Sequence, residues 1–130
     1  MNLKIFVSTW LAIIIQHCCS VGALAQGNEI TDQAYDSIYS VVYELMDTSP
    51  DSALVKIDSL YSATMNNGNA RQQGWNHHLK GEAYYSKNEL ALAWKYYKKG
   101  IKIFDSIADS EGRAEIFNSL GNLAILKGQP

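Results

Sequence analysis

The stretch Gly81-Glu82-Ala83-Tyr84-Tyr85 decides the fold of this chain, because parts of its pattern return at a fixed distance. Gly81 recurs as Gly121, 40 residues later, where it follows Leu120. Counting 40 residues back from Ala93, which lies behind the first stretch, reaches Ala53. Self-similarity at a period of this size is the sequence signature of a repeat array. The spacing therefore predicts stacked copies of one helical unit.

Apolar residues recur at three- and four-residue steps along four segments, which is the pattern of one buried helix face. A further helix between the second and third of these segments is expected from the cap at its start. The expected helices cover residues 31–46, 50–65, 70–86, 89–104 and 110–128, and no segment alternates as a strand does. We expect N-caps at Ser49, Asn69, Asn88 and either Asp109 or Ser110. Gln72 is placed to complete a reciprocal capping pair with Asn69. Gly68 is expected to end the second helix in the left-handed conformation.

Residues 1–25 are organised like a secretory signal peptide. Lys4 supplies a positive start, residues 5–15 are apolar except at two positions, and Ala23-Leu24-Ala25 closes the segment. We expect cleavage after Ala25, and the apolar run is too short for a membrane span. The sequence thus predicts an exported protein, periplasmic or extracytoplasmic. Residues 26–30 form a flexible lead, and residues 31–128 form the helical domain.

Both cysteines, Cys18 and Cys19, lie inside the predicted signal peptide. The mature chain therefore has no disulfide and no thiolate chemistry, so burial alone must hold its fold together. Cys18 follows His17 and not the small residue that a lipid anchor needs.

The charge balance bears on the class of partner. Removing Lys4 with the signal peptide leaves 10 basic against 13 acidic residues. Nucleic-acid recognition calls for a clustered basic surface and usually a high pI. The acidic excess and the export signal together argue against a nucleic-acid partner.

The repeated residues resemble the tetratricopeptide repeat, a helix-turn-helix unit. The clearest copy spans residues 74–104. The expected units are residues 31–68, 69–108 and a partial unit at 109–128, and the residues that match the family's pattern are Gly81, Tyr84, Ala93, Tyr97, Leu120, Gly121 and Ala53. The resemblance implies an all-α, right-handed superhelix with a concave binding surface lined by the first helix of each unit.

By position in the family, six residues are expected on that concave surface: Trp75, His78, Glu82, Tyr85, Asn118 and Asn122. Rings supply contact area and amides pair with an extended backbone, so this set suits a protein or peptide partner. Packing between neighbouring helices is the alternative role for Trp75 and Tyr85.

The long repeat behind a signal peptide is similar to the exported regions of bacterial membrane-bound sensor kinases and transcriptional regulators. We therefore expect a non-catalytic protein-interaction module that forms the extracytoplasmic sensory part of a signalling protein. A free-standing periplasmic scaffold or oligomerisation protein is the alternative. The fifth helix lacks the partner that a full unit supplies. Either the chain continues, with membrane contact only through a downstream span, or this helix self-associates with another copy.

Candidate chemistry is sparse. His78 and Glu82 share a helix face at a four-residue spacing, but zinc takes at least three protein ligands and the spacing offers no third. The serines, Ser119 included, lie in no Gly-x-Ser-x-Gly elbow. Glu111 and Glu115 lie near a helix start, where the helix dipole favours carboxylates. We expect no metal, no cofactor and no catalytic residue.

Two further groups of residues have ordinary explanations. Lys95, Lys98, Lys99 and Lys102 follow one side of the fourth helix, which is typical of a solvated outer face. Docking of an acidic partner or an anionic membrane surface is the alternative. The tyrosines of the first, third and fourth helices predict core packing, with a sugar-binding platform as the alternative.

Overall fold

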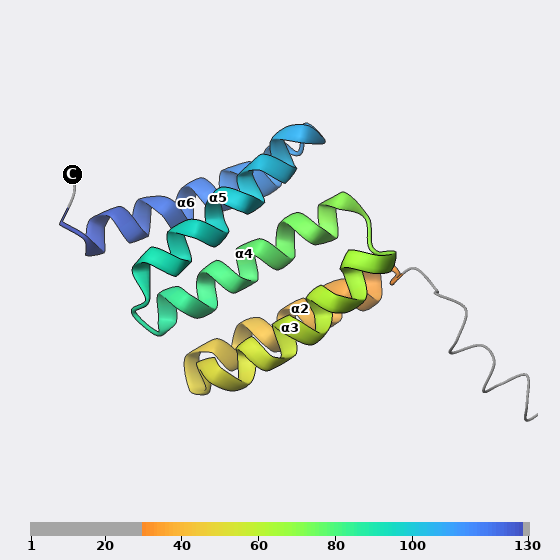
Figure 1. The fold of residues 1–130 in the computed structure, drawn as a ribbon, viewed down its shortest axis with the longest axis horizontal. Coiled ribbons are helices and arrows are strands. Elements are labelled where there is room, and N and C mark those ends of the chain that lie inside the picture. Colours follow the sequence, from red (N-terminus) through yellow and green to blue (C-terminus); the bar gives the residue numbers. More distant parts are fainter. Residues whose placement is uncertain (1–29, 129–130) are drawn as a thin grey trace, which may run out of the picture.

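The computed structural model describes residues 30–128, so the predicted signal peptide and cleavage site lie outside the described residues. The described chain is all-α, with five helices: α2 (Asp32–Thr48), α3 (Pro50–Asn67), α4 (Ala70–Ser86), α5 (Leu90–Ser106) and α6 (Ser110–Leu126). Each helix runs antiparallel to the one before it (Figure 1). None of them combines the length and apolar character that crossing a membrane requires.

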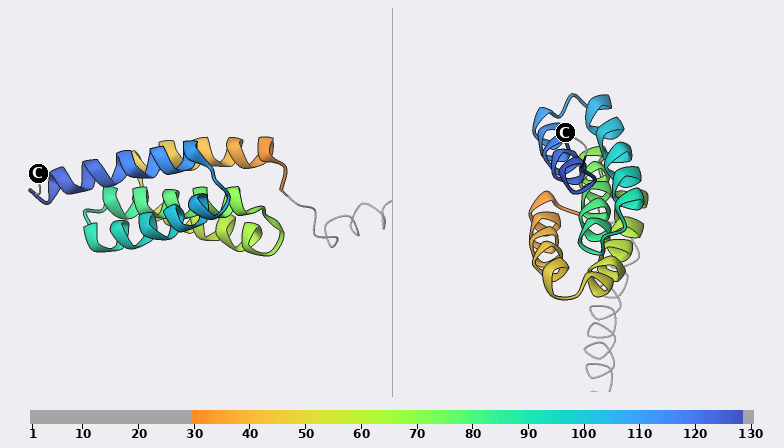
Figure 2. Two further views of the ribbon diagram at one scale, coloured as in Figure 1. Left: turned by 90° about the horizontal axis from the view of Figure 1, so that it is seen from above. Right: turned by 90° about the vertical axis from the view of Figure 1, so that its left-hand side faces the viewer.

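The helices are arranged around α4, which contacts each of the other four. Helices α2 and α6 lie on one side of α4, and α3 and α5 lie on the other (Figure 2). Because α4 is covered from both sides, polar residues along it are buried, among them Gln72, Asn76, His77 and His78. Buried polar groups must find partners within the protein, and these partners build the site described below.

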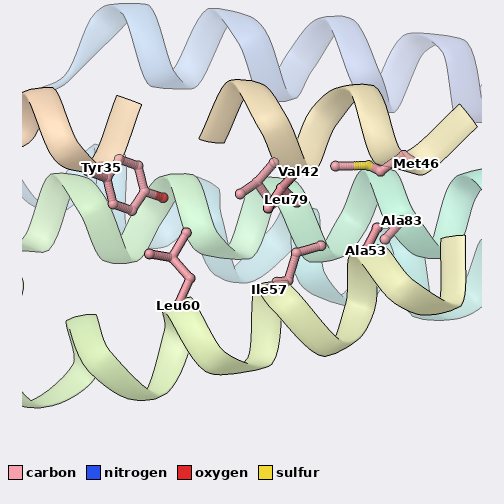
Figure 3. Close-up of a cluster of buried hydrophobic side chains, with 8 residues drawn as sticks. All are labelled: Tyr35, Val42, Met46, Ala53, Ile57, Leu60, Leu79 and Ala83. Atoms are coloured by element: carbon pink, nitrogen blue, oxygen red, sulfur yellow. The ribbon is translucent and has the colours of Figure 1, made fainter. Parts of the chain in front are cut away.

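The core consists of two apolar clusters that meet at α4. The first joins α2, α3 and α4 through Tyr35, Val42, Met46, Ala53, Ile57, Leu60, Leu79 and Ala83 (Figure 3). The second joins α5 and α6 through Ala93, Tyr97, Phe104, Ile116 and Leu123. Trp75 packs against both clusters, so the two cores are continuous through its ring.

The glycines of the repeat pattern lie in different surroundings. A Cβ on Gly81 would collide with the ring of Tyr97, so this glycine permits a close approach of α4 and α5. The small residues Ala53 and Ala93 are fully buried. In contrast, a Cβ on Gly121 would meet nothing within 4 Å, because its side of α6 is open.

Three helix starts are capped by side chains. Thr31 Oγ1 accepts from Ala34 N at 3.3 Å, and Asn69 Oδ1 accepts from Gln72 N at 2.9 Å. Asp109 Oδ1 accepts from Gly112 N at 3.0 Å, which settles the expected choice between Asp109 and Ser110.

Four local expectations were wrong. Ser49 precedes α3 but donates to Ser52 Oγ at 2.8 Å and caps no amide. Glu89, and not Asn88, is the N-cap residue of α5, while Asn88 takes φ 59°, a left-handed conformation that asparagine tolerates. Gln72 donates to the carbonyl of Ile30 at 2.9 Å and does not complete a reciprocal pair. Gly68 is extended, with φ −94°.

Candidate functional site

A chain of hydrogen bonds joins α2, α4 and α6. The hydroxyl of Tyr39 lies 3.0 Å from His78 Nδ1. On the other side of the ring, His78 Nε2 lies 3.1 Å from Ser119 Oγ and 3.3 Å from Glu82 Oε1. His78 is 1% exposed, so both ring nitrogens find their partners inside the protein. We call Tyr39, His78, Glu82, Tyr97 and Ser119 the polar bridge.

Glu82 receives most of the donors of the polar bridge. Its Oε1 accepts from Ser119 Oγ at 2.6 Å and from Tyr97 Oη at 2.8 Å. The tautomer of His78 with its proton on Nε2 satisfies the remaining groups, since Tyr39 then donates to Nδ1 and Nε2 donates toward Ser119 and Glu82. Every donor of the bridge therefore has an acceptor.

The bridge also sets the charge of Glu82. Burial raises the pKa of this carboxyl group, but hydrogen bonds from His78 and Ser119 outweigh it and lower the pKa below the ordinary value of 4.5. Burial and the neighbouring Glu82 raise the pKa of the Tyr97 hydroxyl. Glu82 is thus an ionised carboxylate at neutral pH, held by donors from three helices.

The polar bridge differs from a nucleophilic triad. In a triad, the carboxylate binds the ring nitrogen opposite the serine. Here Ser119 and Glu82 both meet Nε2, and Tyr39 takes Nδ1. The hydroxyl of Ser119 donates to the carboxylate, so its proton is not passed to the imidazole. This geometry links α2, α4 and α6 and lacks the order of groups found in a triad.

Two further groups of polar contacts connect neighbouring hairpins. Tyr35 Oη donates to Asn76 Oδ1 at 2.7 Å, and Asn76 donates to Thr64 Oγ1, which links α2, α4 and α3. Arg71 pairs with Asp109 at 3.0 Å and with Glu111 at 2.9 Å, which links α4 to the start of α6.

The 40-residue period reappears in these contacts. Tyr39 and His78 are 39 residues apart, His78 and Ser119 are 41 apart, and Arg71 and Glu111 are 40 apart. Residues about 40 positions apart in the chain therefore contact one another across neighbouring hairpins.

The residues expected on one binding surface occupy different environments. Trp75 is partly buried, with its ring centroid 5.2 Å from that of Phe104 and 5.7 Å from that of Tyr39. Tyr85 packs against the second apolar cluster. His78 and Glu82 belong to the polar bridge, whereas Asn118 and Asn122 are exposed on α6. Trp75 and Tyr85 therefore make packing contacts between neighbouring helices, which is the alternative role that the sequence left open for them.

Tyr43 and Glu115, which were not expected at a binding surface, lie beside the polar bridge on the accessible side of α2 and α6. Tyr43 is 46% exposed, and its ring stacks on that of Tyr39 with centroids 6.1 Å apart. Burial raises the pKa of Tyr43, and the charges of Glu82, Glu115 and Asp47 raise it further, so acidic groups lie near its hydroxyl. We call Tyr39, Tyr43, Glu115, Asn118 and Asn122 the α2–α6 face.

The sequence spacing carried a signal for two members of the polar bridge. Tyr39 lies 39 residues before His78, and Ser119 lies 41 residues after it, so each is within one residue of the 40-residue spacing.

Comparison with family models, with curated proteins and with solved structures finds no match to this chain. Within the described residues, no group of three histidine, cysteine or acidic side chains is placed to hold a metal ion.

Proposed function

We propose that this protein is a non-catalytic binding module that recognises a protein or peptide through the α2–α6 face. The polar bridge carries this proposal. The buried side chains of His78, Glu82 and Ser119 form hydrogen bonds that hold three helices together. Aromatic rings and amides beside them remain accessible. A face held in one shape loses less conformational freedom on binding than a flexible one.

The chemistry of the face favours a particular partner. Tyr43 offers ring area, and Asn118 and Asn122 offer amides that pair with an extended backbone. Glu115 and the nearby charge of Glu82 make the face negative. A segment of protein that carries basic side chains complements this potential.

The chain's place in a larger system follows from the resemblance. The contacts near 40-residue separation support stacked tetratricopeptide-like units, and the leader supports export. We place the module at the extracytoplasmic front of a bacterial signalling protein. Sequencing the gene past residue 130 tests this placement, since a membrane span followed by a kinase or DNA-binding domain is expected and a stop codon contradicts it.

Binding at the α2–α6 face is tested by crosslinking in the exported fraction. The variant Tyr43→Ala with Asn122→Lys changes exposed side chains only, so the fold is kept. Val55→Ala is the control, because Val55 is 71% exposed on a different helix, α3. A partner captured by the wild type and the control, and lost from the double variant, is expected. Equal capture by all three proteins would exclude this face.

A self-associating scaffold is the second candidate, and the open side of α6 favours it. Phe117 and Ile125, about two turns apart on the side of α6 that carries Gly121, are large apolar residues that are exposed. Exposed apolar residues that share one helix side can form a contact with another molecule. Light scattering after size exclusion tests this candidate, with a dimer or larger assembly in the wild type and a monomer for Phe117→Ser with Ile125→Ser. A monomeric wild type removes the candidate.

A further inference from the structure

The outer side of α5 is a second surface, separate from the α2–α6 face. Among the described helices, α5 packs against α4 and α6 and has no contact with α2 (Figure 2). Its exposed residues include Lys95, Lys98, Lys99 and Lys102. We call these four lysines, with Trp94, Tyr96 and Lys127 beside them, the α5 basic surface.

The lysines of this surface have no acidic partners. Within the described residues, none of the ion pairs involves a lysine of α5 or Lys127. Arg71, Lys80, Lys87 and Arg113 are all paired. The acidic residue of α5, Asp105, faces Arg113 at 3.5 Å. Unpaired positive charge is thus concentrated on one helix of a protein whose net charge is −2.

Aromatic rings border the lysines on both sides. Trp94 is 45% exposed, with Lys98 Nζ 5.7 Å and Lys127 Nζ 5.9 Å from its ring centroid. On the other border, Lys99 Nζ lies 5.3 Å from the ring of Tyr96. Between Trp94 and the four lysines lies a shallow hollow of about 330 Å³.

We propose that the α5 basic surface docks on anionic phospholipid headgroups. Tryptophan and tyrosine beside lysine is the composition that prefers the boundary between water and bilayer. The exposed cations of the surface are all lysines. Lysine carries a compact positive charge on a flexible stem, so it can follow phosphate groups whose positions are not fixed. Each lysine near an anionic bilayer strengthens partitioning roughly fivefold.

Vesicle binding by the full chain tests the proposal. Co-sedimentation is measured with vesicles of phosphatidylglycerol in phosphatidylcholine and with phosphatidylcholine alone. The apolar residues 5–15 are common to every variant, so only differences between variants are used. Lys98→Gln is expected to lower partitioning to the anionic vesicles roughly fivefold. Lys56→Gln is the matched control, since Lys56 is exposed on α3 and also lacks an ion pair.

The triple variant Lys95→Gln, Lys98→Gln and Lys102→Gln is expected to reduce anionic partitioning about a hundredfold. High salt should also reduce binding of the wild-type protein to the anionic vesicles. Circular dichroism should be unchanged, because these side chains are exposed. Retained binding by the triple variant overturns the proposal. Capture of a polyglutamate peptide without any preference for anionic vesicles also overturns it, and assigns the surface to an acidic protein.

Discussion

Ser119 on α6 donates a hydrogen bond of 2.6 Å to Glu82 on α4. Both side chains are largely buried, and they are 37 residues apart in the chain. The same carboxylate oxygen accepts from Tyr97 on α5. One charged group therefore fixes the relative positions of three helices.

Replacing Glu82 by glutamine should weaken the fold at neutral pH. The amide still accepts hydrogen bonds but without charge, so we expect a loss of about 1–2 kcal/mol in the free energy of unfolding. The pKa of Glu82 in the folded protein lies below its ordinary 4.5. Its contribution is therefore complete above that value and is lost as pH falls through the folded pKa. Denaturant titrations of both proteins from neutral pH to about pH 3 check this, and a constant difference would contradict it.

The two repeat glycines should respond to alanine with opposite signs. Gly81→Ala places a methyl group against the ring of Tyr97, and overpacking of this kind costs about 1–3 kcal/mol. Gly121→Ala meets no neighbour within 4 Å and gains helix propensity, which stabilises by about 0.5–1 kcal/mol. Thermal unfolding of the two variants is the measurement. A shift of the same sign in both would refute this reading of the contacts.

His77 should make the fold sensitive to mild acid. Burial, followed by the charges of Lys99 and Lys80, lowers the pKa of His77 from 6.5 to about 4. Between these two pH values His77 is protonated in the unfolded chain but not in the folded protein. The free energy of unfolding therefore falls as pH drops from 6.5 toward 4, and it levels off below.

The variant His77→Phe isolates this effect. Phenylalanine keeps the stacking on Tyr96, whose centroid is 6.0 Å away, and removes a buried Nδ1 that has no hydrogen-bond partner. At about pH 4 we expect a gain of up to about 3 kcal/mol relative to the wild type, shrinking toward neutral pH. The two proteins are compared by urea unfolding at several pH values. If the free energy of unfolding of the variant depends on pH as steeply as that of the wild type, the pH dependence does not come from His77.

The two acids that meet Arg71 should differ in their importance. Asp109 pairs with Arg71 and also caps α6 through Gly112 N, whereas Glu111 only pairs. We expect Asp109→Ala to cost about 1–2 kcal/mol, and Glu111→Ala to change stability by less than about 0.5 kcal/mol. Chemical denaturation measures both. Equal losses would mean that the cap contributes nothing.

Much of the helical pattern could be predicted from local signals. The apolar stripe of α5, which includes Ala93, Tyr97 and Phe104, is buried as expected. Helix α4 was recognised through its cap at Asn69 and through Gly81, although many of its buried side chains are polar. Ser49 does not cap α3 because its hydroxyl donates to Ser52, and Asn88 does not cap α5 because it takes the left-handed conformation one residue before the N-cap position.

The candidate site was only half predictable. The four-residue spacing of His78 and Glu82 correctly placed them on one helix face, where they lie 3.3 Å apart. Nothing local marked Tyr39 or Ser119 as their partners, because each lies about one repeat away in the chain. Trp75 could equally have lined a surface or a core until the position of Phe104 was known.

The sequence by itself determined the helices and the 40-residue separation of residues that contact each other, because periodicity, caps and small residues act over short distances or repeat at a fixed one. Only the tertiary structure decided which polar groups are buried partners and which stay accessible. Burial depends on all helices packed around a residue, and α4 has four neighbours. That packing turned His78 and Glu82 into an internal bridge and left Tyr43, Asn118 and Asn122 facing solvent.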